Sequence, residues 1–430
     1  MSNKATKRLV PELRFPEFRE GSAWRLHALG SVGKTVSGLS GKSAEDFGKG
    51  SPFVTYKQVF DNSFVAFDKC GLVRIENGER QNDVVYGDVL ITGSSETPDE
   101  VGFASVVLEK PFEKTYLNSF CFAFRSDTLL LCVPRFSQFL FHSPWYRAKV
   151  GHLAQGSTRF NISKLGFLKL KLPIPTQYEQ QKIADCLSSL DDLITAQAQK
   201  IEALKVHKKG LMQQLFPAEG ETVPTLRFPE FENAQGWVKT TLGQVATFKK
   251  GKGISKAEIS SDGVQPCIRY GELYTHYHEI IDTVISYTNV LSDELVLSQE
   301  NDVIIPASGE TEIDIATASC VLKSGIALGG DLNIIRSKIN GVFLSYYLNN
   351  AKKESIARLA QGISVVHLYS NQLKTLAVNI PENSEQKKIA DCLASLDELI
   401  TTQAQKLATL KTFKQGLMQQ LFPTIDESTA

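Results

Sequence analysis

Two segments near the N-terminus carry the residue types that bind nucleotide phosphates. Residues 33–35 (GKT) and 41–43 (GKS) match the last three positions of the GxxxxGK[ST] loop, which opens with a glycine further upstream. Ala28 and Val36 stand at the positions where that glycine is required. The two segments therefore do not predict nucleotide hydrolysis.

Other catalytic signatures are incomplete as well. The chain has no Pro-Pro dipeptide, whereas an amino-methyltransferase acting on DNA needs a Pro-Pro-aromatic loop to hold the flipped base. Pro98-Asp99 is not followed by the acidic-x-Lys element of a nuclease. His276 and His278 would share one face of a strand, but no third metal ligand accompanies them, which favours a structural role. We expect no catalytic and no metal site.

Two stretches have the composition of a nucleic-acid surface. Residues 147–171 contain six Lys or Arg and no acid, and residues 239–256 contain five lysines and no acid. In the second stretch the glycines of KKGKGISK would let the backbone approach a phosphate closely. Simple solvated loop charge is the alternative, and the formal net charge of +0 argues against a strong binder of DNA acting alone.

The elements that must position these stretches occur twice. Residues 179–217 return as residues 385–423 with 29 of 39 positions identical, and VPELRFPEF at 10–18 returns as VPTLRFPEF at 223–231. Weaker matches join them, such as DVLITGSSET from Asp88 and DVIIPASGET from Asp302. The chain is one unit written twice, which predicts pseudo-twofold symmetry.

The repeated tails predict two long helices. Apolar residues alternate spacings of three and four, as in a coiled-coil seam, over roughly 37 residues or about 55 Å. We expect the two helices to pack antiparallel on each other; two separate helices, each on its own domain, are the alternative. Identities on the outward faces exceed what a seam requires, so a partner is expected to touch both helices alike. The expected seam and interface residues are Ile183, Leu187, Leu190, Ile194, Leu204 and Leu211, and Ile389, Leu393, Leu396, Ile400, Leu410 and Leu417.

Between the repeated elements lie two divergent α/β stretches. Short β-rich runs alternate with turn residues, and each stretch ends in a helix, near Pro134–Val150 and Val342–Leu359. The expected organisation is a lead-in (1–23), a first domain (24–176), a first helix (177–217), a second lead-in (218–236), a second domain (237–382), a second helix (383–423) and a tail (424–430).

Composition places few further limits. No apolar run is long enough for a membrane helix, and the first residues, MSNKATKRLV, have no hydrophobic signal core, so we expect a cytoplasmic protein. The seven cysteines lack any CxxC spacing, which favours reduced thiols.

Taken together, these motifs resemble one family. The ordered pair of LRFPEF, LAQG (Leu153 and Leu359) and EQ-x-KIADCL followed by GLMQQLFP is similar to the specificity subunits of type I restriction-modification systems, over residues 10–423. The resemblance implies an α+β fold of two target recognition domains separated by two antiparallel helices. It also implies a non-catalytic role, which the missing catalytic motifs match.

Partners and cofactors follow from the resemblance alone. It implies double-stranded DNA and two modification subunits as partners, with restriction subunits in the full complex. S-adenosylmethionine for adenine methylation, and ATP and Mg²⁺ for restriction, would be bound by those subunits. Two different domains predict an asymmetric site in two halves, with half-sites about one helical turn, roughly 34 Å, apart.

Comparison of the two copies separates the candidate DNA contacts. Positions kept in both, such as Tyr56/Tyr270 and Glu96/Glu310, suit a shared scaffold or phosphate placement. Positions that differ suit base reading: by geometry Arg159 and Arg269 could bind guanine, and Asn161 adenine. The candidates are Lys42, Ser43, Thr55, Tyr56, Lys57, Gln155, Ser157, Thr158, Arg159 and Asn161, and Lys252, Ser255, Lys256, Arg269, Tyr270, Gln361, Ser364 and His367.

Two other classes of function remain in competition. A coiled-coil scaffold that bridges two protein partners would explain the helices and the neutral charge, but not the matching basic loops. An independent enzyme is disfavoured by the absent catalytic motifs.

Overall fold

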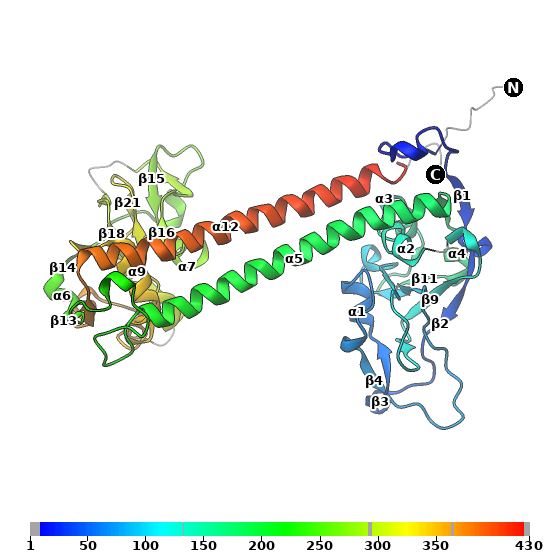
Figure 1. Ribbon diagram of the computed structural model, residues 1–430, viewed down its shortest axis with the longest axis horizontal. Helices are drawn as coiled ribbons and strands as arrows, with labels where there is room; N and C mark the ends of the chain where they lie inside the picture. The colour runs from blue at the N-terminus through cyan, green and yellow to red at the C-terminus, as the bar shows by residue number, and fades with distance from the viewer. Residues whose placement is uncertain (1–8, 132, 291–294, 363–364, 425–430) are drawn as a thin grey trace. The chain divides into compact units, whose positions relative to one another are not determined.

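The computed structural model describes residues 9–131, 133–290, 295–362 and 365–424. The chain divides into two compact units (Figure 1). Unit 1 comprises Met1–Ala198 and Lys406–Ala430, and unit 2 comprises Gln199–Gln405. Each unit therefore contains one divergent stretch and parts of both long helices.

Unit 1 is built on a four-stranded antiparallel sheet, with two three-stranded sheets and a strand pair beside it. The order in the main sheet is β2 (Gly33–Ser37), β9 (Cys121–Ser126), β5 (Val89–Thr92), β7 (Ala104–Val106). The smaller sheets are β4 (Gly71–Val73), β3 (Phe47–Val54), β8 (Tyr116–Leu117), then β10 (Ala154–Gln155), β11 (Phe160–Ile162), β6 (Ser94–Ser95), and the pair β1 (Arg25–Ala28), β12 (Lys171–Ile174). The helices are α1 (Tyr56–Asp61), α2 (Pro134–Leu140), α3 (Pro144–Gly151) and α4 (Lys164–Lys169).

Unit 2 repeats this plan with one more strand in its main sheet. The order is β14 (Ala246–Lys250), β22 (Leu332–Ser337), β18 (Asp302–Pro306), β20 (Ser319–Val321), β16 (Ile280–Ile281). Beside it lie β17 (Ser286–Thr288), β15 (Gln265–Ile268), β21 (Ala327–Leu328), and the pairs β19 (Ser308–Gly309), β23 (Val366–His367) and β13 (Val238–Thr241), β24 (Ala377–Ile380). The short helices are α6 (Leu242–Val245), α7 (Glu272–Thr275), α8 (Glu312–Ile315), α9 (Gly341–Asn350), α10 (Lys353–Ala357) and α11 (Ser370–Lys374).

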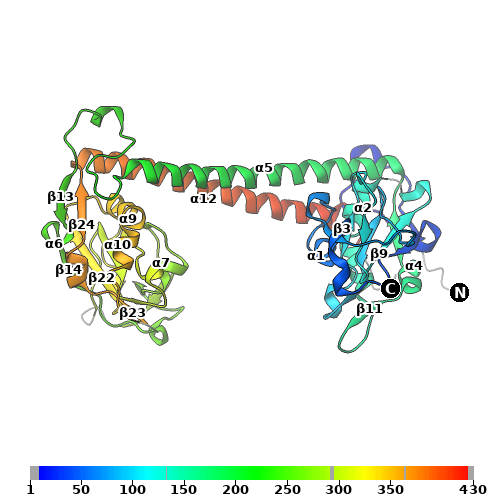
Figure 2. The ribbon, with the colours of Figure 1, turned by 90° about the horizontal axis from the view of Figure 1, so that it is seen from below.

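The two long helices are α5 (Gln177–Leu215) and α12 (Asn383–Gln420). Within each unit their segments lie side by side and antiparallel (Figures 1 and 2), since Asp191 pairs with Lys414 in unit 1 and Asp397 with Lys208 in unit 2. The expected seam residues are buried or half-buried, whereas Leu193 and Phe413 on the outward face are each 57% exposed. The predicted antiparallel pairing is confirmed within each unit.

The ends of the helices belong to the globular cores. In unit 1, Leu187 of α5 and Phe422, just beyond α12, join one apolar cluster with Trp24, whose ring meets that of Phe422 edge-on at 5.9 Å. In unit 2, Phe216 packs edge-on against Trp237 at 6.4 Å. Each unit therefore buries the start of one long helix and the end of the other, which explains why the terminal LFP is repeated.

Two local expectations are wrong. The helices expected near Pro134–Val150 and Val342–Leu359 are each two shorter ones, because Ser143 caps a new helix whose first residue is Pro144, and a break at Ala351 separates α9 from α10. His276 ends α7 and does not lie on a strand, so it and His278 share no strand face.

Among the residues that the structure describes, no helix combines the length and apolarity needed to cross a membrane.

Candidate nucleic-acid interface

Strand pairing brings several predicted contact residues together in unit 1. Gln155 on β10 lies opposite Asn161 on β11, and Asn161 lies opposite Ser94 on β6. The turn between β10 and β11 exposes Ser157, Thr158 and Arg159. These side chains, distant from Ser94 in the sequence, thus share one small sheet.

Unit 2 repeats the arrangement at matched positions. His367 on β23 lies opposite Ser308 on β19, and Gln361 bridges to His367. The His367 ring stacks with that of Tyr369 at 6.2 Å. Ser364, another predicted contact, lies outside the described residues.

A cavity of about 460 Å³ lies beside the small sheet of unit 1. Tyr56 and Phe60, one turn apart on α1, form one wall with stacked rings 6.2 Å apart. The guanidinium of Arg159 lies 4.6 Å from the ring centre of Phe120 at another wall. Ser94, Ser95, Glu96, Glu100 and Asn118 complete the lining.

The cavity floor is polar and partly unsatisfied. Ser95 donates a hydrogen bond to Glu100 Oε2 at 2.7 Å, whereas the buried hydroxyl of Ser94 has no hydrogen-bond partner among the described residues. Burial raises the pKa of Tyr56, against a hydrogen bond with Ser95 that lowers it. A polar ligand or water is needed to satisfy Ser94.

In unit 2 the corresponding aromatic pair is Tyr270 and Tyr274, with rings 6.4 Å apart. Burial raises the pKa of Tyr274, the charges of Glu310 and Asp314 raise it further, and Arg269 lowers it. Arg269 follows β15 and is not the counterpart of Arg159, whose matched position is Val365.

Several candidates have structural roles inside their own unit. Thr55 accepts a hydrogen bond from Gln58 N at 3.2 Å and so caps α1. Ser43 N and Ser255 N each donate a hydrogen bond to the carboxylate three residues later, Asp46 and Glu258, in capping boxes at the starts of short 3-10 helices. All three residues therefore have capping contacts in the free protein.

Lys42 is a correction to the sequence interpretation. Its Nζ lies 2.6 Å from Glu79 Oε2, and its side chain is only 6% exposed. This hydrogen bond is the largest cause that lowers the pKa of Glu79, to about 2. Lys42 is therefore held inside the unit and is not a free phosphate contact.

The glycine-rich loop of unit 2 also needs a different explanation. A Cβ on Gly251 would lie 1.9 Å from the carbonyl oxygen of Gly329, and Gly253 has a φ of +64°. The first glycine thus allows close backbone packing within the unit, and the second a left-handed conformation. Lys252 and Lys256 remain exposed on this loop, as Lys57 does on α1.

The sequence interpretation missed a buried ion pair that both units share. Arg14 donates to both oxygens of Glu179 at 2.7 Å, and Trp24 Nε1 donates to Glu179 Oε1 at 3.1 Å. In unit 2, Arg227 and Trp237 bind Glu385 in the same way. The repeated LRFPEF and EQ-x-KIADCL motifs therefore join each lead-in to the start of a long helix.

A second shared contact lies between the helices and the globular part. In unit 1, Lys414 pairs with Asp191 and lies 5.4 Å from the ring centre of Phe139. In unit 2, Lys208 pairs with Asp397 at 2.7 Å and lies 5.1 Å from the ring centre of Tyr346, whose hydroxyl also binds Asp397. These contacts fix the position of the helix pair against each unit.

His142, near the Lys414 contact, predicts a pH dependence for unit 1. Burial lowers the pKa of His142, and the charges of Arg147 and Lys414 lower it further, against a hydrogen bond with Gln138 O. As the pH falls, the His142 imidazole of the unfolded chain therefore binds a proton before the buried imidazole of the folded chain does. The part of the folding stability that His142 contributes above about pH 6.5 is lost as the pH falls further.

Replacing His142 by Asn, the residue found at the matched position 349 of unit 2, should remove this component. Urea denaturation at about pH 7.5 and about pH 5.5 is the measurement. The free energy of unfolding should fall more from the higher to the lower pH in wild type than in His142→Asn. An equal fall in the two proteins would refute the prediction.

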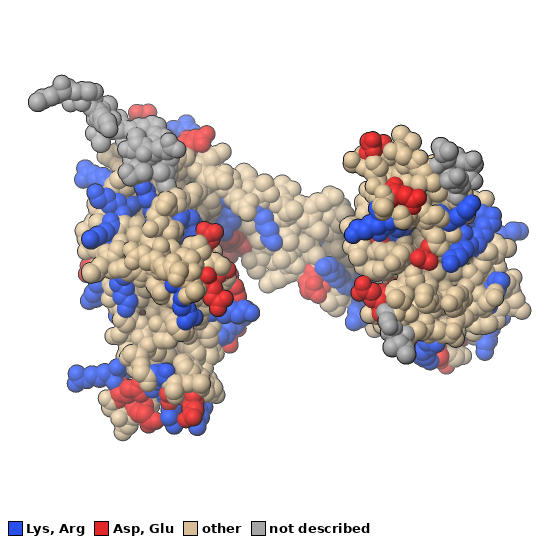
Figure 3. Space-filling view, turned by 180° about the vertical axis from the view of Figure 1, so that it is seen from behind, with Lys and Arg blue, Asp and Glu red and all other residues tan. Residues whose placement is uncertain are grey.

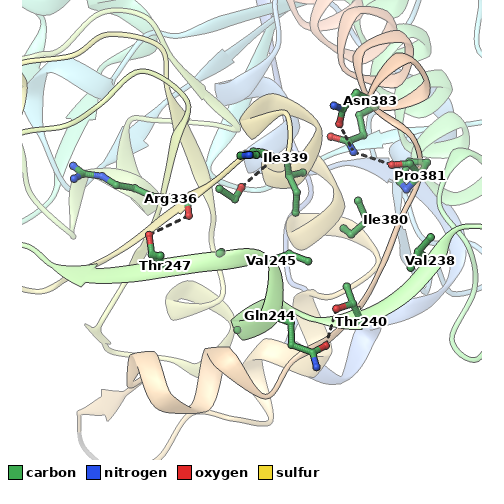
Figure 4. Close-up of a pocket in the computed structure, with 15 residues that line it drawn as sticks. Val238, Thr240, Gln244, Val245, Thr247, Arg336, Ile339, Ile380, Pro381 and Asn383 are labelled. Carbon is green, nitrogen blue, oxygen red and sulfur yellow. Dashed lines mark hydrogen bonds between the residues drawn. The ribbon is translucent and has the colours of Figure 1, made fainter.

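An open cleft with a volume of about 940 Å³ lies in unit 2 (Figure 4). Strands β13, β14 and β22 line it, together with Asn383 and Gln386 of α12. None of the described residues in its lining is an acid, a histidine or a cysteine, and Arg336 is paired with Asp302. The cleft offers no acid–base pair for catalysis.

On the face shown in Figure 3, basic and acidic side chains are interspersed on both units, and the formal net charge of the chain is +0. Such a surface provides little long-range attraction for DNA, so binding would depend on local contacts and on partners.

Both divergent stretches of the chain match one protein family. Residues 23–206 and 234–412 match the model of the type I restriction modification DNA specificity domain. The StySPI specificity subunit of Salmonella potsdam is 24% identical over 362 residues, covering 78% of this chain and 77% of that subunit. The MjaVIII specificity subunit of Methanocaldococcus jannaschii is 25% identical over 275 residues, or 61% of this chain. The matched stretch spans 63% of MjaVIII and 60% of another subunit from the same organism.

Solved structures share the fold. The S subunit from M. genitalium matches with a TM-score of 0.56 at 16% identity, covering 97% of this chain and 100% of that one. The HsdS subunit from Thermoanaerobacter tengcongensis matches with a TM-score of 0.50 at 15% identity, covering 93% and 96%. The duplicated α+β fold and the family expected from the paired motifs are confirmed. The chain belongs to the family of type I restriction-modification specificity subunits.

Proposed function

We propose that the two globular stretches act as target recognition domains, each reading one half of an asymmetric, two-part DNA site. The observation that carries this proposal is the small loop sheet that recurs at matched positions with different side chains. Asn161 and Arg159 in unit 1 correspond to His367 and Val365 in unit 2. A shared frame with different contact residues suits two different half-sites.

The long helices would set the spacing of the half-sites and recruit two modification subunits. Support comes from identical outward positions on α5 and α12, such as Asp185 and Asp391, which the packing between the helices does not require. The seam residues themselves are covered within each unit, so partners would contact the outward faces. Restriction subunits would join the full complex, and DNA as the target implies action in the cytoplasm.

This chain would carry no catalytic group. S-adenosylmethionine for adenine methylation, and ATP with Mg²⁺ for restriction, would be bound by the partner subunits.

The test is to map methylated adenines across a genome after co-expressing the chain with its neighbouring modification subunit. One motif is expected, made of two specified parts separated by unspecified bases. An intact complex that yields no motif would contradict the proposal and favour a protein scaffold.

A further inference from the structure

Unit 1 places an exposed carboxylate and a guanidinium beside an aromatic pair. Glu96 and Arg159 line the 460 Å³ cavity with Tyr56 and Phe60. In unit 2, Glu310 stands at the position that matches Glu96, but Val365 stands at the position that matches Arg159. At these matched positions the couple of carboxylate and guanidinium is present in unit 1 alone.

The carboxylates lack partners that would neutralise them. Among the described residues, neither Glu96 nor Glu310 forms an ion pair or hydrogen bond, and both are exposed. A carboxylate at a DNA surface is repelled by the phosphates, so the sequence-based assignment of this pair to phosphate placement is unfavourable. The hydrogen-bond donors that a carboxylate can meet in the major groove are the amino groups of cytosine and adenine.

Arg159 supplies the complementary chemistry. Its guanidinium lies over Phe120 at 4.6 Å, a contact that restricts it before DNA binds. A guanidinium binds O6 and N7 of guanine with two hydrogen bonds, while a carboxylate accepts from N4 of the paired cytosine. An arginine and a glutamate that line one cavity therefore match a G·C pair.

We propose that unit 1 reads one G·C pair with this couple, Glu96 and Arg159. The inference rests on the proposed function, because it names the bases that the same surface would recognise. The half-site read by unit 1 should then contain a G·C pair at the position facing the couple. The remaining differences, such as Asn161 against His367, distinguish the half-sites.

The experiment uses the complex of the full chain with its modification subunit. Methylated-adenine motifs are mapped for wild type, Glu96→Gln, Arg159→Ala and Glu310→Gln, and binding is measured on duplexes with each base changed. Glu109→Gln and Arg135→Ala are matched controls, since both residues are exposed in unit 1 and do not line the cavity.

Glu96→Gln and Arg159→Ala should relax the same G·C position in one half-site, by on the order of 10- to 100-fold in discrimination. Glu310→Gln, in the unit that has Val365 in place of Arg159, should leave that position unchanged. Binding of Glu96→Gln to a duplex with a scrambled half-site should stay equal or increase, because a repulsive charge is lost.

Three outcomes would overturn the inference while leaving the proposed function intact. They are the absence of a G·C pair from the half-site that unit 1 reads, relaxation of different positions by Glu96→Gln and Arg159→Ala, and equal weakening on all duplexes. A wild-type complex without any two-part motif would instead overturn the proposed function, and this inference with it.

Discussion

Replacing Leu187 by Asp is expected to unfold unit 1. Leu187 is 0% exposed and lies in the apolar cluster that contains Trp24. Truncating a buried leucine costs about 2–5 kcal/mol, and a buried, unpaired carboxylate adds several more. The total approaches the entire stability of a typical domain, about 5–15 kcal/mol.

Denaturation followed by tryptophan fluorescence is the measurement, because Trp24 and Trp145 are both buried in unit 1. The matched control is Leu193→Asp, on the same helix but at a side chain that is 57% exposed, and it should fold normally. A folded Leu187→Asp variant with wild-type stability would show that the start of α5 is not part of the core.

This expectation differs from the one that the heptad pattern suggests. A coiled-coil seam alone predicts that Asp at Leu187 or Leu393 separates the helices and prevents assembly. The structure instead buries both residues in the globular cores, with Leu393 in the cluster around Trp237. Loss of folding within one unit should therefore precede any effect on partner recruitment.

The sequence predicted the elements whose signal is local or repeated. The seam of α5 and α12 follows from a helical period, and α5 ends at Leu215, just before Phe216-Pro217, because proline cannot continue a helix. The duplication itself was visible as identity. Both kinds of signal can be read without knowing the tertiary structure.

The cavity beside α1 could not be predicted in the same way. Tyr56, Gln155, Arg159 and Asn161 were named as contacts, but the cavity residues Phe60 and Phe120 were not. Their proximity arises from strand pairing between segments far apart in the chain, and no local pattern encodes that pairing. Arg159 meets Phe120 only once the small sheet is formed.

The capping roles of Ser43 and Ser255 had a readable signal. In SAED and SKAE a serine is followed three residues later by an acid, which is the pattern of a capping box. Lys42 is different, since its partner Glu79 lies on another segment and only the fold reveals the ion pair. Basic residues in a loop are thus ambiguous until their acids are located.

Glu179→Ala is expected to destabilise unit 1 by about 3–5 kcal/mol, because removal of one partner leaves the buried charge of Arg14 uncompensated. The side chains of Arg14 and Glu179 are 6% and 2% exposed. Trp24 would also lose its acceptor, which leaves a buried N–H unsatisfied. Chemical denaturation of the variant measures the loss, and Glu385→Ala should affect unit 2 alike.

A double-mutant cycle separates the ion pair from general packing. Because Arg14 and Glu179 act as one buried couple, the Arg14→Ala/Glu179→Ala double variant should lose less stability than the two single variants combined. The control is Glu17→Ala, which breaks the exposed pair with Lys182 on the same lead-in and should leave the denaturation midpoint unchanged. Additive losses at Arg14 and Glu179 would mean that the lead-in is held to α5 by apolar packing around Trp24 rather than by the repeated ion pair.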